Sequence, residues 1–220
     1  MIYAPSLACA RQINLEADVR QLIEGGMPFL HIDFMDGHNV PNLCANLDTA
    51  RELKDAFPGI TLDAHLMVTN PEDYVARSAA AGIDYLSFVP DTAQDPAALL
   101  QRIREAGMKP GIVVNPEHSP EEFQDLLPLA DMVILMSIVP GGVRRPFDEH
   151  TYDKIRALAQ YRSERLLNYL ISIDGGINRD NGRTCRLCGA DVLILGFYAI
   201  FQQEIPIPDA CRRFRSWIET

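Results

Sequence analysis

Histidine and aspartate residues stand at the ends of short apolar runs, where imidazole and carboxylate groups could together hold a metal ion. His31 and Asp33 are two positions apart, so in an extended strand they point to the same side. His65 ends a second apolar run, and Asp174 follows a third. Two imidazoles and two carboxylates suit Zn²⁺, Fe²⁺, Mn²⁺ or Co²⁺, and the lack of thiolate argues against a closed structural zinc site. We therefore expect one divalent metal ion per chain at these four residues.

These side chains can meet only if the apolar runs belong to one sheet. The runs are continuous rather than alternating, which is typical of strands buried on both faces in a parallel sheet. They occupy residues 2–4, 29–32, 61–65, 85–89, 111–114, 132–136, 169–173 and 192–195. Amphipathic segments typical of helices follow them, at residues 15–24, 48–56, 72–81, 97–106, 120–127, 149–165, 179–188 and 209–218.

Several of the predicted helices carry start or stop signals. Ser119 and Pro120, followed by two glutamates, are typical of an N-cap and a first helical turn. Gly82, Gly107 and Gly189 each follow a helical pattern at the position where a left-handed C-cap is expected.

Eight strand–helix units in 220 residues, with no linker between them, predict an α/β fold: a single (β/α)₈ TIM barrel as one domain over residues 1–220. An open doubly wound sheet is the alternative. It usually has fewer strands, and the first turn here lacks the motif G-x-G-x-x-G. Active sites of TIM barrels lie at the carboxyl ends of the strands, which is where the histidines and aspartates fall.

The composition of the chain argues against some classes of binding partner. The formal net charge of −10 argues against a nucleic acid or an anionic membrane surface. No stretch approaches the roughly 18 apolar residues of a membrane helix, and the first residues do not resemble a signal peptide. Five scattered cysteines favour a reducing compartment, so we expect a cytoplasmic protein. Cys185 and Cys188 form a C-x-x-C, which we interpret as two helix residues; a redox or metal role is the alternative.

The sequence blocks around these residues resemble one known family. Residues 31–42 read H-I-D-F-M-D-G-H-N-V-P-N, which resembles the signature of the ribulose-phosphate 3-epimerase family and its relatives acting on other ketose phosphates, such as allulose 6-phosphate. The match continues in A-P-S at 4–6, D-A-H-L-M-V at 63–68, M-S at 136–137, I-D-G-G at 173–176 and G-A-D at 189–191. The resemblance runs from residue 2 to about residue 201.

The resemblance implies a (β/α)₈ barrel and a metal-dependent epimerase that inverts C3 of a pentulose or hexulose phosphate through an enediolate. It implies that Asp33 and Asp174 are the catalytic acid/base pair as well as metal ligands, with His31 and His65 as the other two ligands. The substrate-binding residues implied or inferred at the barrel mouth are Ser6, His31, His65, Met35, Met67, Met136, Gly141, Gly142, Arg144, Gly175, Gly176, Gly196 and Phe197. From position alone, the three methionines could equally fill the core or form an apolar collar over the metal.

Two loops depart from the family pattern and leave the substrate's identity open. The family has a loop like N-P-G-F-G-G-Q after the sixth strand, whereas residues 139–145 read V-P-G-G-V-R-R. After the eighth strand, G-S is replaced by G-F-Y at residues 196–198. The alternatives are the same epimerisation on an unphosphorylated or acidic sugar, and a metal-containing sugar-binding protein without turnover.

The altered loop and the loop after the second strand each raise a further hypothesis. Arg144 or Arg145 could contact the anionic end of the substrate, the alternative being two solvated arginines. Related epimerases are commonly homo-oligomers, which we expect here too. Phe34, Val40 and Leu43 either meet a partner surface or fold back over the chain's own active site.

Overall fold

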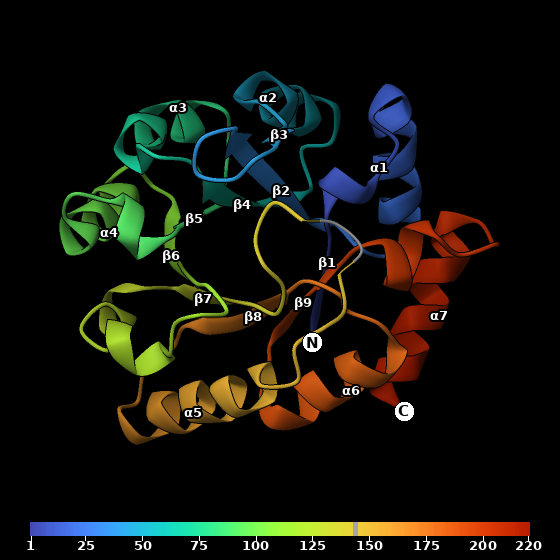
Figure 1. The fold of residues 1–220 in the computed structure, drawn as a ribbon. Helices are drawn as coiled ribbons and strands as arrows, with labels where there is room; N and C mark the ends of the chain where they lie inside the picture. The colour runs from blue at the N-terminus through green and yellow to red at the C-terminus, as the bar shows by residue number, and fades with distance from the viewer. Residues whose placement is uncertain (143–144) are drawn as a thin grey trace.

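In the part of the chain that the structure describes, eight parallel strands form the centre of the molecule, with helices arranged around them (Figure 1). The computed structural model describes residues 1–142 and 145–220. The parallel strands are β1 (Ile2–Pro5), β2 (Phe29–Asp36), β4 (Thr61–Met67), β5 (Tyr85–Phe88), β6 (Lys109–Val114), β7 (Met132–Met136), β8 (Leu170–Asp174) and β9 (Val192–Leu195). Their continuous apolar sequences suit strands that are covered on both faces.

The sheet closes on itself. Parallel pairing runs from β2 through β4, β5, β6, β7, β8 and β9 to β1. A parallel bridge between Ser6, just after β1, and His31 in β2 joins the two ends. The predicted (β/α)₈ TIM barrel is therefore confirmed. One short strand was not predicted: β3 (Leu43–Cys44) pairs antiparallel with the end of β2.

Within the described residues, seven α-helices surround the barrel (Figure 1). They are α1 (Leu15–Glu24), α2 (Leu47–Ala56), α3 (Val75–Ala80), α4 (Pro96–Glu105), α5 (Thr151–Glu164), α6 (Arg179–Cys188) and α7 (Ile207–Glu219). Short 3₁₀ turns occupy η1 (Leu7–Cys9), η2 (Gln12–Asn14), η3 (Pro71–Tyr74) and η4 (Pro90–Thr92), and a π-helical turn, η7, occupies Phe197–Phe201. Gly82, Gly107 and Gly189 have the predicted left-handed backbone, with φ of +78°, +88° and +113°.

The helix predicted at residues 120–127 is wrong. The segment forms two 3₁₀ turns instead, η5 (Pro120–Phe123) and η6 (Leu127–Leu129). Pro128 explains the difference, because proline lacks an N–H group and disfavours a helical conformation in the residue before it. The predicted N-cap is confirmed, since Ser119 and Glu122 form a capping box at the start of the segment.

Apolar side chains fill both the space inside the barrel and the space between strands and helices. Val113, Ile134 and Ile194 are among the buried residues of the inner cluster, whereas Leu30 and Leu86 belong to the outer one. Alternate residues of a strand face opposite sides, so each strand contributes to both layers. The inner layer becomes polar towards the carboxyl ends of β2, β4 and β8, and this change of polarity creates the candidate site.

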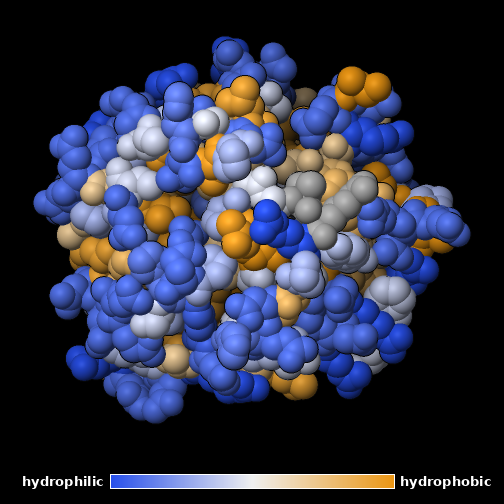
Figure 2. All heavy atoms as spheres, in the orientation of Figure 1, coloured by the Kyte–Doolittle hydropathy of each residue, from blue (hydrophilic) through white to orange (hydrophobic). Residues whose placement is uncertain are grey.

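The described residues on the face seen in Figure 2 form no single broad apolar patch. Figure 2 shows mainly hydrophilic side chains around the rim, with apolar side chains scattered among them. Among the described residues, no helix combines the length and apolar character needed to cross a membrane.

The C-cap of α6 yields a stability prediction. Gly189→Ala should destabilise the protein by about 1–3 kcal/mol, because φ is +113° and the new Cβ would lie 2.8 Å from the Cβ of Ala159. Urea unfolding followed by circular dichroism measures the loss. Gly59→Ala is the matched control, since nothing lies within 4 Å of its added Cβ. Equal stability of the two variants would contradict the prediction.

Candidate metal centre and active site

Three strands bring the four predicted metal ligands together. His31 and Asp33 lie in β2, His65 lies in β4, and Asp174 ends β8. The parallel ladder between β2 and β4 places Asp33 directly opposite His65. One potential ligand atom from each of the four residues lies within 4.8 Å of the others. The geometry predicted from the sequence, two imidazoles and two carboxylates converging at one mouth, is therefore present.

The donor atoms of the two histidines face the same two carboxylates. His31 Nε2 lies 3.2 Å from Asp33 Oδ1 and 3.9 Å from Asp174 Oδ2. His65 Nδ1 lies 3.6 Å from Asp33 Oδ1 and 3.9 Å from Asp174 Oδ2. Both histidines are fully buried, whereas 17% of the Asp174 side chain is exposed. The four groups thus surround one position that opens towards the mouth on the side of Asp174.

The residues present fit a divalent metal ion. Neither ring nitrogen of His65 has a hydrogen-bond partner among the described residues, although the side chain is completely buried. A buried polar atom without a partner is costly, so an imidazole in this position needs one. Its Nδ1 faces the carboxylates, and the nitrogen and oxygen donor set is one that Zn²⁺, Fe²⁺, Mn²⁺ and Co²⁺ accept.

The protonation states of the cluster are shifted in different directions. Burial raises the pKa of Asp174 to about 6, and the neighbouring Asp33 carboxylate adds to the shift. Burial acts in the same sense on Asp33, but His31 and His65 outweigh it and bring the pKa of Asp33 well below its usual range. For His31, burial is outweighed by Asp33 and Asp63, which raise the pKa of the imidazole. Carboxylates whose environments separate their pKa values are typical of acid/base pairs.

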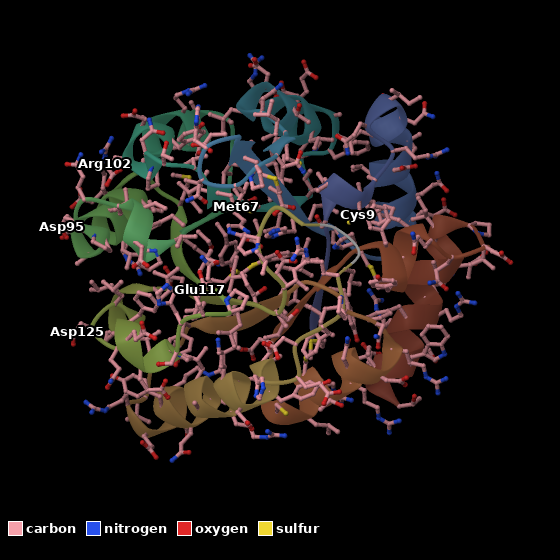
Figure 3. All side chains as sticks on the ribbon, in the orientation of Figure 1. Cys9, Met67, Asp95, Arg102, Glu117 and Asp125 are labelled. Atoms are coloured by element: carbon pink, nitrogen blue, oxygen red, sulfur yellow. The ribbon has the colours of Figure 1, made fainter. Side chains whose placement is uncertain are left out.

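A cavity over the cluster is lined by most of the predicted substrate-binding residues. Its walls include Ser6, Asp33, Met35, Met67, Met136, Gly141, Gly142, Asp174, Gly175, Gly176, Gly196 and Phe197. His31 and His65 lie beneath the cavity rather than in its wall, and Arg144 lies outside the described residues. Figure 3 shows Met67, from β4, and Cys9, from the turn after β1, on the inner side of the helices. All three methionines line this cavity, as the collar hypothesis requires.

The loops after β2 and β7 pack against each other at the mouth. A side chain at Gly141, where φ is +73°, would lie 2.7 Å from the Cβ of Val40. The expectation for Phe34 is wrong, because it lies within β2 and packs in the outer apolar cluster rather than in the loop. Val40 is buried, whereas Leu43 is 75% exposed. The loop after β2 thus packs against the loop after β7 through Val40 and Gly141, and the expected homo-oligomer stays a prediction. Arg145 approaches the same mouth, since its Nε lies 2.6 Å from the position a Cβ would take at Gly142.

The sequence patterns predict no role for Cys9, Tyr198 or Asp63, which lie near the site. Cys9 and Tyr198 line the cavity, and the backbone of Phe197 hydrogen-bonds to Cys9. Asp63 is fully buried and hydrogen-bonds to His31. Its position two residues before His65 on one strand was a usable signal, because such residues share a face. All five cysteines are free, and Cys185 and Cys188 lie in α6.

Comparison with known proteins decides the family. The family model described as the ribulose-phosphate 3 epimerase family matches residues 2–201 of this chain. The chain belongs to the ribulose-phosphate 3-epimerase family. A ribulose-phosphate 3-epimerase from Aquifex aeolicus is 34% identical over 195 residues, covering 89% of this chain and 87% of the relative. One from Treponema pallidum is 35% identical, covering 88% of each chain.

Solved structures support the same fold. The 3-hexulose-6-phosphate synthase from Salmonella typhimurium superposes with a TM-score of 0.75 at 13% identity, over 100% of this chain and 99% of the other. At that identity the likeness shows the fold alone. The resemblance seen in the sequence is confirmed, and membership of the ribulose-phosphate 3-epimerase family makes this protein an isomerase of the epimerase type.

The shifted pKa values predict that metal binding releases protons. The raised pKa of His31 favours its protonated form when no metal is bound, so metal binding should displace a proton from this residue. Asp174, with its pKa of about 6, should contribute a further proton below pH 6, so affinity should fall on acidification. Titration calorimetry in two buffers of different ionisation enthalpy counts the protons.

A control separates this effect from the rest of the protein. The pKa of His118 is also raised, by its hydrogen bond to Glu122, in an ion-paired cluster with Asp91 that shares no residue with the metal centre. His118→Gln should leave the proton count unchanged. Binding without proton release at pH 6 would contradict the assignment of His31 and Asp174 as ligands.

Proposed function

We propose that this protein inverts C3 of a ketose phosphate, a pentulose or hexulose phosphate, by proton transfer between Asp33 and Asp174. One divalent metal ion would be held by His31, Asp33, His65 and Asp174. The observation that carries the proposal is the convergence of these two carboxylates, with oppositely shifted pKa values, on one position beneath the cavity. Membership of the ribulose-phosphate 3-epimerase family supports the same reaction.

The chemistry demands both charge stabilisation and two proton-transfer groups. A proton on the carbon beside a ketone is acidic only if the resulting enediolate is stabilised, and a bound divalent ion supplies that positive charge. One aspartate removes the C3 proton from one face, and the other returns a proton to the opposite face. The two residues stand on strands that are not neighbours in the barrel, β2 and β8, so they approach the substrate from different directions.

The surroundings of the two aspartates suit this division of work. Ser6 Oγ donates a hydrogen bond to Asp33 Oδ2 at 2.9 Å, which stabilises the ionised form and fixes the orientation of the carboxylate. Asp174 lies in the cavity wall and holds a proton more readily. Because epimerisation is reversible, the two residues exchange the roles of acid and base with the direction of reaction.

Backbone amides of the cavity support a phosphorylated substrate. The N–H groups of Gly175, Gly176 and Gly196 donate to no acceptor among the described residues, and all three glycines line the cavity. Consecutive amides in left-handed backbone form a concave anion site, and φ is +109° at Gly175 and +60° at Gly176. These groups would bind the phosphate, and the Arg145 guanidinium would add a charged contact.

Replacing Asp174 tests the two-base scheme. Asp174→Asn should lower the turnover number by about 10²- to 10⁴-fold, the range of a lost general acid or base, with a smaller effect on KM. Deuterium incorporation at C3 in heavy water measures turnover across ribulose 5-phosphate, allulose 6-phosphate and their unphosphorylated counterparts, and metal content is measured in parallel.

An exposed carboxylate serves as the control for that substitution. Asp125 lies at the outer edge of the molecule in Figure 3, and Asp125→Asn should leave turnover unchanged. Near-normal epimerisation by Asp174→Asn would show that the two-base scheme is wrong. Turnover of only unphosphorylated sugars by the parent would overturn the proposed substrate class.

The anionic contact has its own test. Arg145→Ala should raise KM for the phosphorylated ketose by one to two decades, or roughly 1.5–3 kcal/mol, and leave KM for the unphosphorylated sugar unchanged. Arg156→Ala, on an exposed arginine of α5, is the matched control. Arg144→Ala is measured separately. If neither Arg144→Ala nor Arg145→Ala discriminates between the two substrates, the glycine amides are left as the anion site.

A further inference from the structure

Asp63 is a buried carboxylate to which the proposed reaction gives no role. It lies in β4 with no exposed surface, two residues before His65 and on the same face of the strand. The ladder between β2 and β4 sets Asp63 directly opposite His31. His31 Nδ1 lies 2.7 Å from Asp63 Oδ2, a short contact for a nitrogen–oxygen hydrogen bond. The residue therefore contacts a candidate metal ligand from behind.

This contact fixes which nitrogen of His31 is available to a metal ion. An ionised carboxylate only accepts hydrogen bonds, so Nδ1 must carry a proton and donate it to Asp63. In neutral imidazole, Nε2 then holds the free electron pair, and Nε2 is the atom that faces Asp33 and Asp174. The ring is held both in orientation and in tautomer.

The other histidine lacks such a partner. His65 faces the carboxylates with Nδ1, and its Nε2 has no hydrogen-bond partner within residues 1–142 and 145–220. Of the two histidines, His31 alone has a carboxylate behind it in the described part of the chain. Because only one of the two buried imidazoles has such a partner, the Asp63 carboxylate is a specific feature of this centre. It is not a general consequence of burying a histidine.

The energetic cost of Asp63 also needs an explanation. A fully buried carboxylate is expensive unless its charge is compensated. Among the described residues its only ion-pair partner is His31, and Asp63 Oδ1 has no hydrogen-bond partner. A divalent ion on the far side of the imidazole would compensate this charge through the ring, as in other carboxylate–histidine–metal arrangements.

We propose that Asp63 is a positioning residue of the metal centre, which holds His31 with Nε2 towards the metal position and strengthens that nitrogen as a donor. The inference rests on the metal ligands of the proposed function but not on the identity of the sugar. Replacing a residue that hydrogen-bonds to a metal ligand typically lowers metal affinity by 10- to 100-fold.

Two variants of near-equal size separate charge from orientation. Asp63→Asn keeps an acceptor for Nδ1 but removes the negative charge, whereas Asp63→Leu removes both. Zn²⁺ affinity, measured by competition with a chromophoric chelator, should fall about 10-fold in Asp63→Asn and about 100-fold in Asp63→Leu. Circular dichroism establishes that each variant is folded. Asp63→Asn alone decides the matter if the leucine variant does not fold.

A second readout reports on the hydrogen bond itself. In the Zn²⁺-loaded parent, proton NMR of ¹⁵N-histidine-labelled protein should show a strongly deshielded, slowly exchanging Nδ1 proton on His31. Its shift should move upfield in Asp63→Asn, and the signal should be lost from this position in Asp63→Leu. A merely structural role for Asp63 would not require this signal, so its absence from the loaded parent would overturn the inference.

Ser172→Ala is the matched control. Ser172 is fully buried, stands two residues before Asp174 as Asp63 stands before His65, and has no hydrogen-bond partner among the described residues. Its replacement should leave Zn²⁺ affinity within twofold. Folded Asp63→Asn with affinity within twofold of the parent would overturn the role of Asp63 alone. A parent that binds no Zn²⁺ would overturn the proposed metal centre as well.

Discussion

The register between β2 and β4 is the constraint on which the site depends. It sets His31 beside Asp63 and Asp33 beside His65, so two imidazoles and two carboxylates form a compact block on the inner face of two neighbouring strands. Because side chains alternate along a strand, a slip by one residue would move one strand's pair to the outer face, among the apolar residues under the helices. The apolar residues between them, such as Ile32 and Ala64, belong to that outer layer and hold the register.

Much of the fold could be predicted because a buried parallel strand gives a continuous run of apolar residues in the sequence. Runs such as Met132–Met136 and Val192–Leu195 are continuous and apolar, and both coincide with strands of the barrel. The failures have local causes. Pro128 stops a helix that the amphipathic pattern favoured, and β3 is too short for any periodicity to reveal. The strand β3 is recognisable only through its pairing with the end of β2, which the sequence pattern does not reveal.

The candidate site was predictable to the extent that strand ends determine it. Chain order alone brings Asp174 to the mouth with His31, because the carboxyl ends of parallel strands share one end of the barrel. Cys9 enters the cavity from a 3₁₀ turn, and Tyr198 from a π-helical turn, and neither turn has a clear sequence signal. The partner of Asp63 depends on the ladder register, which a strand pattern does not specify.

The cluster places three carboxylates and two imidazoles in a space from which water is largely excluded, and such an arrangement opposes folding. The raised pKa of Asp174 has the same physical cause, since burial and the nearby Asp33 both disfavour its ionised form. The conflict is tolerated because apolar layers on both faces of a closed sheet determine the backbone independently of the polar residues. A divalent cation at the centre of the block would compensate the negative charges. The aspartates, which repel one another, would then all be attracted to the cation. The same clustering of carboxylates that is unfavourable without a counter-charge is therefore what would give the site its affinity for the ion.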